Sequence, residues 1–236
     1  MDGFDTTGIE FLGDWTQPNI EEIIALEPDL IVGYEGQLNN YEDFSAIAPT
    51  VLIQIFERPL DEALMDFAKL ANAEEKGEAF RAAYQEQVNR IVAGLGERHN
   101  ELTVVILNPI NSNEYFRVYE SGQTIGTVSD ALAINGMVAK SPEEFDAGTQ
   151  SMEALDEHMG DVVLILDYSI EDAESEVDKF ISSPLLMSQP TAQAGQVYRL
   201  DGSRTVGSAW ARMEAFLDTL EEILLDPDLN IDLVTE

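Results

Sequence analysis

The 236-residue sequence contains no cysteine, only two histidines and no apolar run long enough to cross a membrane. Without cysteine there is no disulfide, no thiolate metal site and no cysteine nucleophile. A membrane-spanning helix needs about 20 consecutive apolar residues, whereas the longest apolar runs here, such as Val162–Leu166, have the length of a strand. The 44% of apolar residues predict an ordinary globular protein.

Basic residues are scarce as well. Twelve lysines and arginines face 46 acidic residues, which gives a formal net charge of −34. Such a charge repels nucleic acids and anionic membranes, so we expect no nucleic-acid partner. The acidity is compatible with a halophilic source, which composition alone does not establish. It also makes each of the few arginines informative.

Signatures of catalysis are absent from the sequence. The two histidines, His99 and His158, lie in polar segments, do not form a ligand-spaced pair and are expected at the surface. There is no nucleophile elbow, phosphate-binding loop or dinucleotide fingerprint, and the acidic residues are too numerous to single out a catalytic pair. We therefore expect no enzyme, no metal site and no cofactor.

Short apolar runs alternate with amphipathic stretches, a pattern typical of an α/β protein. The expected strands are Leu30–Val32, Val51–Phe56, Thr103–Leu107, Phe116–Tyr119, Val162–Leu166 and Val197–Leu200. The expected helices are Ile20–Leu26, Leu60–Ala71, Ala73–Leu95, Ile125–Ala133, Met152–Glu157, Glu174–Phe180 and Ser208–Leu224.

The longest helical pattern runs from Ala73 to Leu95. It contains no proline, and its apolar residues recur at three- and four-residue spacing. Gly94 and Gly96 mark its end. At about 1.5 Å per residue the helix would be over about 30 Å long, which is enough to join two lobes. A long helix within a single domain is the alternative.

Two distant segments, Asn19–Ile31 and Ser151–Val163, share one pattern. Each begins with a helix-capping residue, followed by an apolar residue and a glutamate, and each ends with an aspartate that precedes a strand. The repeat indicates two equivalent lobes. Chance similarity between two ordinary helix–strand units is the alternative.

Several short strings carry a family resemblance. They are Gln17–Ile23 (QPNIEEI), Leu26–Gly33 (LEPDLIVG), Phe44–Val51 (FSAIAPTV), Ser183–Leu186 (SPLL) and Ala192–Tyr198 (AQAGQVY). In this order and spacing they resemble the helical-backbone solute-binding proteins of ABC importers, which bind ferric siderophores, haem or cobalamin. The pattern of residues 73–95 resembles the rigid helix that joins the two lobes of these proteins.

The resemblance implies an α/β fold of two Rossmann-like lobes joined by one long helix. We expect an N-terminal lobe at residues 1–72, the connecting helix at 73–98 and a C-terminal lobe at 99–236. The family normally has a strand and a helix before the QPNIE string, which only 16 residues precede here. We therefore expect an abbreviated N-terminal lobe, natural or truncated, with an open sheet edge through which the protein could dimerise.

The function implied by the resemblance is reversible capture of a ferric siderophore in the cleft between the lobes, and its delivery to an ABC permease. A haem- or cobalamin-binding protein of the same family is one alternative, and a degenerate module without a transport role is another. A related enzyme architecture would call for cysteine or paired histidine ligands. We expect a periplasmic or membrane-anchored extracytoplasmic protein, with the signal segment absent because Asp2 follows Met1 without a basic or apolar stretch.

Ligands of open α/β sheets bind beyond the carboxyl ends of the strands, where this sequence places arginines and aromatic residues. Guanidinium groups would offset the charge of an anionic chelate, and aromatic rings would cover its apolar faces. Direct iron binding by tyrosine phenolates is the less favoured alternative. Tyrosines at the rim, Trp210 in the core or Arg117 paired with a carboxylate would be structural alternatives. The binding candidates are Tyr34, Arg58, Arg117, Tyr168, Arg204, Trp210, Trp15 and Tyr115.

Two glutamates have a separate interpretation. Glu21 and Glu153 occupy matching positions of the repeat, early in their helices. The resemblance implies that one glutamate of each lobe docks into arginine pockets of the permease. A favourable interaction with the N-terminal end of each helix, worth about 0.3–1 kcal/mol, is compatible with that role.

Overall fold

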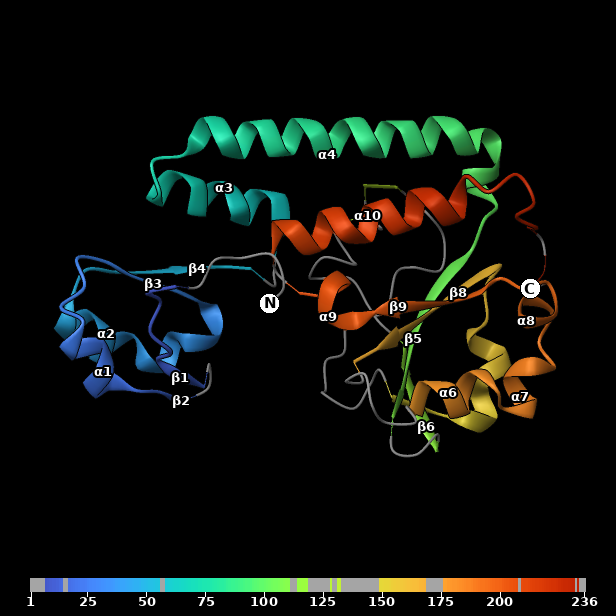
Figure 1. Ribbon diagram of the computed structural model, residues 1–236, viewed down its shortest axis with the longest axis horizontal. Helices are drawn as coiled ribbons and strands as arrows, with labels where there is room; N and C mark the ends of the chain where they lie inside the picture. Colours follow the sequence, from blue (N-terminus) through green and yellow to red (C-terminus); the bar gives the residue numbers. More distant parts are fainter. Residues whose placement is uncertain are drawn as a thin grey trace. The chain divides into compact units, whose positions relative to one another are not determined.

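The structure, a computed structural model of the chain (Figure 1), describes residues 7–14, 17–55, 58–110, 114–118, 128, 131–132, 149–168, 176–207, 209–231 and 233. It divides into two compact units, Met1–Ile55 and Phe56–Glu236. The division places the long helix in the same unit as the C-terminal sheet. The lobe limits expected at residues 72 and 98 stay a prediction.

The first unit contains two small sheets and short helices. Its elements are β1 (Gly13–Asp14), β2 (Gln17–Pro18), α1 (Ile20–Ala25), β3 (Ile31–Tyr34), the 3-10 helix η1 (Glu35–Asn40), α2 (Tyr41–Ile47) and β4 (Thr50–Ile53). β1 pairs antiparallel with β2, and β3 pairs parallel with β4. Helices α1 and α2 lie on one side of the β3–β4 pair (Figure 1), and their residues Ile23 and Phe44 are buried.

Local chemistry explains where α1 begins and ends. The side chain of Asn19 accepts a hydrogen bond from the Glu22 amide at 3.4 Å, which caps the first turn. Glu21 and Glu22 place negative charge near the positive end of the helix dipole. After the helix, Glu27 adopts a positive φ of 47°, and Pro28 follows, so the helix does not continue.

The second unit is built on a five-stranded sheet with the order β7-β6-β5-β8-β9. Its strands are β5 (Val104–Ile110), β6 (Tyr115–Val118), β7 (Thr149–Ser151), β8 (Val162–Asp167) and β9 (Val197–Asp201). Its helices are α3 (Leu60–Leu70), α4 (Glu74–Leu95), η2 (Gly96–Asn100), η4 (Met152–His158), α6 (Glu176–Ile181), α7 (Pro184–Met187), α8 (Pro190–Gln193), α9 (Gly202–Thr205) and α10 (Trp210–Leu224). β5, β8 and β9 are parallel, whereas β6 and β7 continue the sheet antiparallel.

Strand β8 lies at the centre of the parallel part and is buried along its whole length. Alternate side chains of a strand point to opposite faces of the sheet. Val162, Leu164 and Leu166 enter an apolar cluster with residues of α4 and α10. Val163 and Ile165 enter a second cluster with residues of η4, α6 and α7. Helices therefore cover both faces, as the near-continuous apolar sequence of this strand predicts.

The predicted long helix is confirmed as α4, whose 22 residues extend over about 33 Å. Figure 1 shows it running alongside α3 and α10, both of which it contacts. Tyr84, Val88, Ile91 and Leu95 form its buried stripe. No described helix combines the length and apolar character that crossing a bilayer requires.

Most predicted elements are present among the described residues, and the differences concern short elements. The segment Met152–His158 is a 3-10 helix instead of an α-helix. Helix α2, the two-residue strands β1 and β2, and β7 were not predicted, because short elements carry little periodicity. The predicted helix Ile125–Ala133 lies largely outside the described residues, of which 128 and 131–132 are helical.

The two copies of the sequence repeat each form a capped helix followed by a strand, although the helix is an α-helix in the first copy and a 3-10 helix in the second. Ser151 caps η4 as Asn19 caps α1, and a parallel strand pair follows each helix. Their surroundings differ, because β8 has a neighbour on each edge whereas β3, within the described residues, has β4 alone. Leu30 and Val32 are accordingly 38% and 40% exposed, while the matching residues of β8 are fully buried.

A hydrogen-bonded network ties the amino ends of β5, β8 and β9 together. The buried carboxylate of Asp161 accepts hydrogen bonds at 2.8 Å from the Thr103 amide, the Thr103 hydroxyl and the Leu233 amide. Gln196 donates to the carbonyl oxygens of Asp161 at 2.7 Å and Asn230 at 2.9 Å. The segment after α10 is therefore fixed to the sheet by polar contacts.

Removing this carboxylate should destabilise the second unit. We expect Asp161→Ala to lower the free energy of unfolding by about 1–3 kcal/mol, because donors in a partly buried site lose their acceptor. Urea denaturation measures the change. Asp29→Ala, at the exposed equivalent position of the repeat, is the matched control and should leave the midpoint unchanged. An equal effect of both substitutions would contradict this account.

Candidate ligand-binding site

The carboxyl ends of the parallel strands in the second unit meet at one edge of the sheet. β5 ends at Ile110, β8 at Asp167 and β9 at Asp201. The antiparallel strand β6 begins at this same edge, because Tyr115 pairs with Ile110. Ligand sites of open α/β sheets lie beyond such an edge.

Two binding candidates, Tyr168 and Arg204, lie just beyond these strand ends. The exposed ring of Tyr168 packs against Gly202, where an added Cβ would lie 2.6 Å from a ring carbon. Asp201 caps the turn that follows, since its carboxylate accepts hydrogen bonds from the amides of Ser203 at 2.9 Å and Arg204 at 3.2 Å. The cap fixes the backbone of Arg204 two residues after the glycine that supports the tyrosine.

Arg199 of β9, which the sequence did not single out, pairs with the aspartate that ends β8. The guanidinium of Arg199 forms ion pairs with the buried Asp167 and, at 2.7 Å, with Asp178. Desolvation opposes the charged form, but the hydrogen bonds and charges of the two carboxylates outweigh it and raise the pKa of Arg199. Arg199 therefore positions the end of β8, from which Tyr168 follows.

Strand β6 contributes two further candidates. Tyr115 is exposed at the carboxyl edge, and Arg117 is half-buried, opposite Asn108 of β5 and Thr149 of β7. Because residues two apart on a strand point to the same face, Tyr115 and Arg117 share one face of the sheet. The structure thus brings Tyr115, Tyr168 and Arg204 to one edge, with Arg117 deeper in the sheet.

In the first unit, Tyr34 ends β3 and folds over the next turn. An added Cβ at Gly36 would lie 2.4 Å from its ring, so the glycine is needed for this close approach. The side chain of Gln37 accepts a hydrogen bond from the Tyr34 amide at 3.4 Å. Burial, together with the charges of Glu35 and Asp14, raises the pKa of the Tyr34 phenol, so it stays protonated at neutral pH.

Arg58 is held by a carboxylate of the neighbouring helix. Its guanidinium forms an ion pair with Asp66 of α3, which also accepts a hydrogen bond from Lys69 at 3.0 Å. The hydrogen bonds from Arg58 and then Lys69 lower the pKa of Asp66. A ligand would therefore have to compete with Asp66 for this arginine.

The two tryptophans are placed differently. The ring of Trp210 stacks on Phe80 at 5.6 Å between centroids and contacts Tyr84 edge-to-face at 5.8 Å. It thereby helps to hold α10 against α4, which is the core role left open by the sequence, and its role in binding stays a prediction. Trp15 lies outside the described residues.

The remaining candidates are the two glutamates and the histidines. Glu21 and Glu153 are both exposed at the second position of their helices, as the repeat predicts. His158 was expected in solvent but is half-buried, edge-to-face against Phe116 with centroids 5.6 Å apart. Among the described residues no group of three or more His, Asp or Glu side chains could hold a metal ion.

Sequence reasoning missed three residues that build this edge: Asp167, Arg199 and Gly202. The first two come from neighbouring strands, and their ion pair depends on the register Asp167↔Asp201, which the sequence does not display. Asp201 followed by Gly202 directly after a strand is a turn signal. That signal could have indicated a close approach at Gly202.

The sequence matches the family described as periplasmic binding protein over residues 9–203. The Fe(3+)-citrate-binding protein YfmC of Bacillus subtilis is 28% identical over 194 residues, which are 80% of this chain and 59% of that protein. The ferric-anguibactin-binding protein FatB of Vibrio anguillarum is 25% identical over 232 residues, 94% of this chain and 69% of that protein. This chain covers less than two thirds of the length of two curated Bacillus subtilis relatives, 63% and 59%.

Solved structures share the fold. The iron-uptake system-binding protein FeuA of Bacillus subtilis superposes with a TM-score of 0.73 at 21% identity, over 91% of this chain and 78% of that one. The mixed α/β architecture predicted from the sequence is thereby confirmed.

The support of Tyr168 by Gly202 can be tested directly. We expect Gly202→Ala to displace the Tyr168 ring, because a methyl group would overlap it. With 3-fluorotyrosine incorporated, the fluorine resonance of Tyr168, assigned by Tyr168→Phe, should shift strongly. Ser203→Ala, an exposed neighbour, is the control. An unchanged resonance in Gly202→Ala would rule out the close contact.

Proposed function

Because this chain belongs to the periplasmic binding protein family, we propose that it is the extracytoplasmic solute-binding protein of an ABC importer. It captures a ferric siderophore reversibly and delivers it to the membrane permease. The observation that carries the proposal is the family match, together with relatives named for ferric citrate and ferric anguibactin. Binding, not catalysis, is its role, as in the family.

The carboxyl edge of the second unit supplies groups suited to an anionic chelate. Arg204 is exposed, and within the described part of the chain no carboxylate forms an ion pair with it. Its guanidinium can donate forked hydrogen bonds to carboxylate, catecholate or hydroxamate oxygens. Tyr168 and Tyr115 offer rings to the apolar faces of the chelate and hydroxyls to its rim.

The iron keeps the ligands of the siderophore in this mechanism. A tyrosine would have to lose its proton to bind iron directly, whereas the Tyr34 phenol, whose pKa is raised by burial and by the charges of Glu35 and Asp14, is protonated at neutral pH before any metal is present. A protonated phenol instead donates a hydrogen bond to a chelate oxygen. Contacts of this kind break without ligand exchange at the metal, so the intact complex can be released to the permease.

Arginine substitutions test the site. We expect Arg204→Ala to weaken binding of a ferric siderophore by roughly 10- to 100-fold, the effect of losing a charged hydrogen bond worth about 1.5–3 kcal/mol. Arg117→Ala should weaken it less, because Arg117 is half-buried within β6. Quenching of intrinsic fluorescence measures the affinity. Arg90→Ala, which removes an exposed arginine on α4, is the matched control.

The panel for this titration contains ferric hydroxamate, catecholate and citrate chelates, haem and cobalamin, with iron-free chelators as controls. Saturation by haem or cobalamin alone would replace the siderophore with one of the alternative ligands. A folded protein that responds to none of them would show a degenerate binding module. Equal losses in Arg204→Ala and Arg90→Ala would exclude Arg204 from the site.

The paired glutamates give a separate prediction about the permease. We expect Glu21→Ala and Glu153→Ala to leave the affinity for the ferric ligand unchanged and to slow uptake by the reconstituted importer. The reason is that both carboxylates are exposed at the second position of their helices. Glu42→Ala, an acidic residue in the first turn of α2, is the control. A loss of affinity for the ferric ligand in Glu21→Ala or Glu153→Ala would contradict the docking role.

A further inference from the structure

Charge is distributed unevenly at the carboxyl edge of the second unit. The connections that leave this edge, residues 110–115, 167–176 and 201–204, contain seven acidic residues and one basic residue, Arg204. The acidic residues are Glu114, Asp167, Glu171, Asp172, Glu174, Glu176 and Asp201. A ligand that approaches this edge therefore meets more negative than positive charge, and such a field acts on the ligand before contact.

Two arginines on the strands behind this edge do not reverse the balance. Arg199 is held between Asp167 and Asp178, so its single positive charge is already matched by two carboxylates. Arg117 is half-buried within β6. Arg204, the basic residue of the connections, can balance one negative charge of a ligand. The edge is therefore poorly equipped for a ligand with several negative charges.

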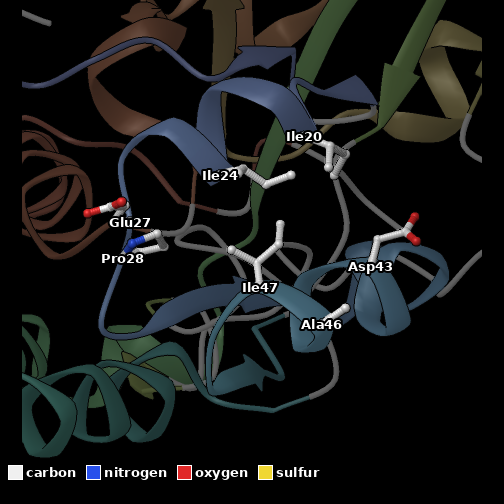
Figure 2. Close-up of a pocket in the computed structure, with 7 residues that line it drawn as sticks. All are labelled: Ile20, Ile24, Glu27, Pro28, Asp43, Ala46 and Ile47. Carbon is white, nitrogen blue, oxygen red and sulfur yellow. The ribbon is translucent and has the colours of Figure 1, made fainter.

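The first unit supplies no counter-charge. Residues 1–57 contain no lysine, arginine or histidine. Figure 2 shows a pocket of this unit between α1 and α2, which is lined by aliphatic side chains, Pro28 and the carboxylates of Glu27 and Asp43. Every basic side chain that could balance an anionic ligand therefore belongs to the second unit.

Ferric chelates differ in net charge. Three hydroxamate groups, each with a single negative charge, neutralise Fe³⁺, whereas three doubly charged catecholates leave a triply negative complex. Ferric citrate complexes are negative as well, because their carboxylates outnumber the charges of the iron. Desolvation of a charge without a partner is costly, and unfavourable charges against the wrong ligand are a common source of specificity.

We propose that the carboxyl edge selects its ligand by net charge and takes a ferric trihydroxamate, neutral or with a free amine, over catecholate and citrate complexes. The inference rests on the proposed siderophore-binding function and names the class of siderophore. Arg204 donates hydrogen bonds to the negatively polarised hydroxamate oxygens, and Tyr115 and Tyr168 cover the apolar chain of the chelate. The acidic connections attract an amine and repel complexes with several negative charges.

A matched series of ligands separates net charge from chelate shape. One linear trihydroxamate is used with its terminal amine free, acetylated or succinylated, so that the ferric complex is cationic, neutral or anionic around the same iron centre. Quenching of intrinsic fluorescence gives the affinity of the full chain for each complex. We expect the free-amine complex to bind at least as tightly as the acetylated one, and the succinylated complex to bind about threefold to tenfold more weakly. A ferric triscatecholate should bind more weakly still.

Salt should change these affinities in opposite directions. The titrations are run at the lowest salt concentration at which circular dichroism shows a folded protein, and again at a roughly tenfold higher concentration, which shortens the Debye length about threefold. Added salt screens the repulsion of the succinylated complex and the attraction of the free-amine complex. We therefore expect the succinylated complex to bind more tightly and the free-amine complex less tightly, while the acetylated complex changes little.

Paired substitutions locate the effect at the carboxyl edge. Glu114→Gln with Glu176→Gln removes two exposed carboxylates, one next to Tyr115 and one at the start of α6. The control is Glu97→Gln with Glu101→Gln, which removes two exposed carboxylates just before the amino end of β5, at the opposite edge of the same sheet. Both double variants have the same net charge. We expect the carboxyl-edge variant to bind the succinylated complex about threefold more tightly, and the control variant to leave its affinity nearly unchanged.

The outcomes separate this inference from the proposed function. Tightest binding of the succinylated complex or of the triscatecholate, equal affinities across the series, or equal effects of the two double variants would overturn selection by charge and leave siderophore binding intact. Binding of haem or cobalamin alone, or of no ferric chelate by the folded protein, would overturn the proposed ligand and this inference with it.

Discussion

The double pairing of β8 is the interaction on which the second unit depends. The strand is buried on both faces and hydrogen-bonded to β5 and β9, so it holds two apolar clusters and three parallel strands in one register. That register sets the carboxyl ends of the strands level with one another. Tyr168 and Arg204 are exposed together because the buried residues before them are fixed, and the candidate site is thus a consequence of the core.

The first unit shows what the same sequence pattern becomes without a second neighbouring strand. Asp161 is buried because Thr103, just before β5, donates to it, whereas Asp29 at the equivalent position is exposed. The residues that follow each aspartate show the same contrast, because Leu30 and Val32 are partly exposed whereas Val162 and Leu164 are buried. A shared sequence pattern therefore gives a capped helix and a strand in both units, while burial depends on what lies beside them.

This dependence also explains how much could be predicted. The periodicity of α4 and the apolar run of β8 each lie within one continuous segment, so both elements were predicted from the sequence alone. Trp210 could not be assigned to core or site, because its stacking on Phe80 joins residues distant in the chain. The pairing of Arg199 with Asp167 likewise follows from strand register, which no local pattern displays.

The scarcity of cations gives the arginines of this protein unequal roles. In a chain with 46 acidic residues, a guanidinium group can meet a carboxylate of the protein before it meets a ligand. Arg58 and Arg199 are engaged in this way, and to bind a chelate each would have to give up an ion pair. Arg204 has no such competitor among the described residues, so it can meet an anionic ligand without the loss of an ion pair within the protein. On this argument Arg204 should contribute more to affinity than Arg58, whereas the sequence alone favours Arg58.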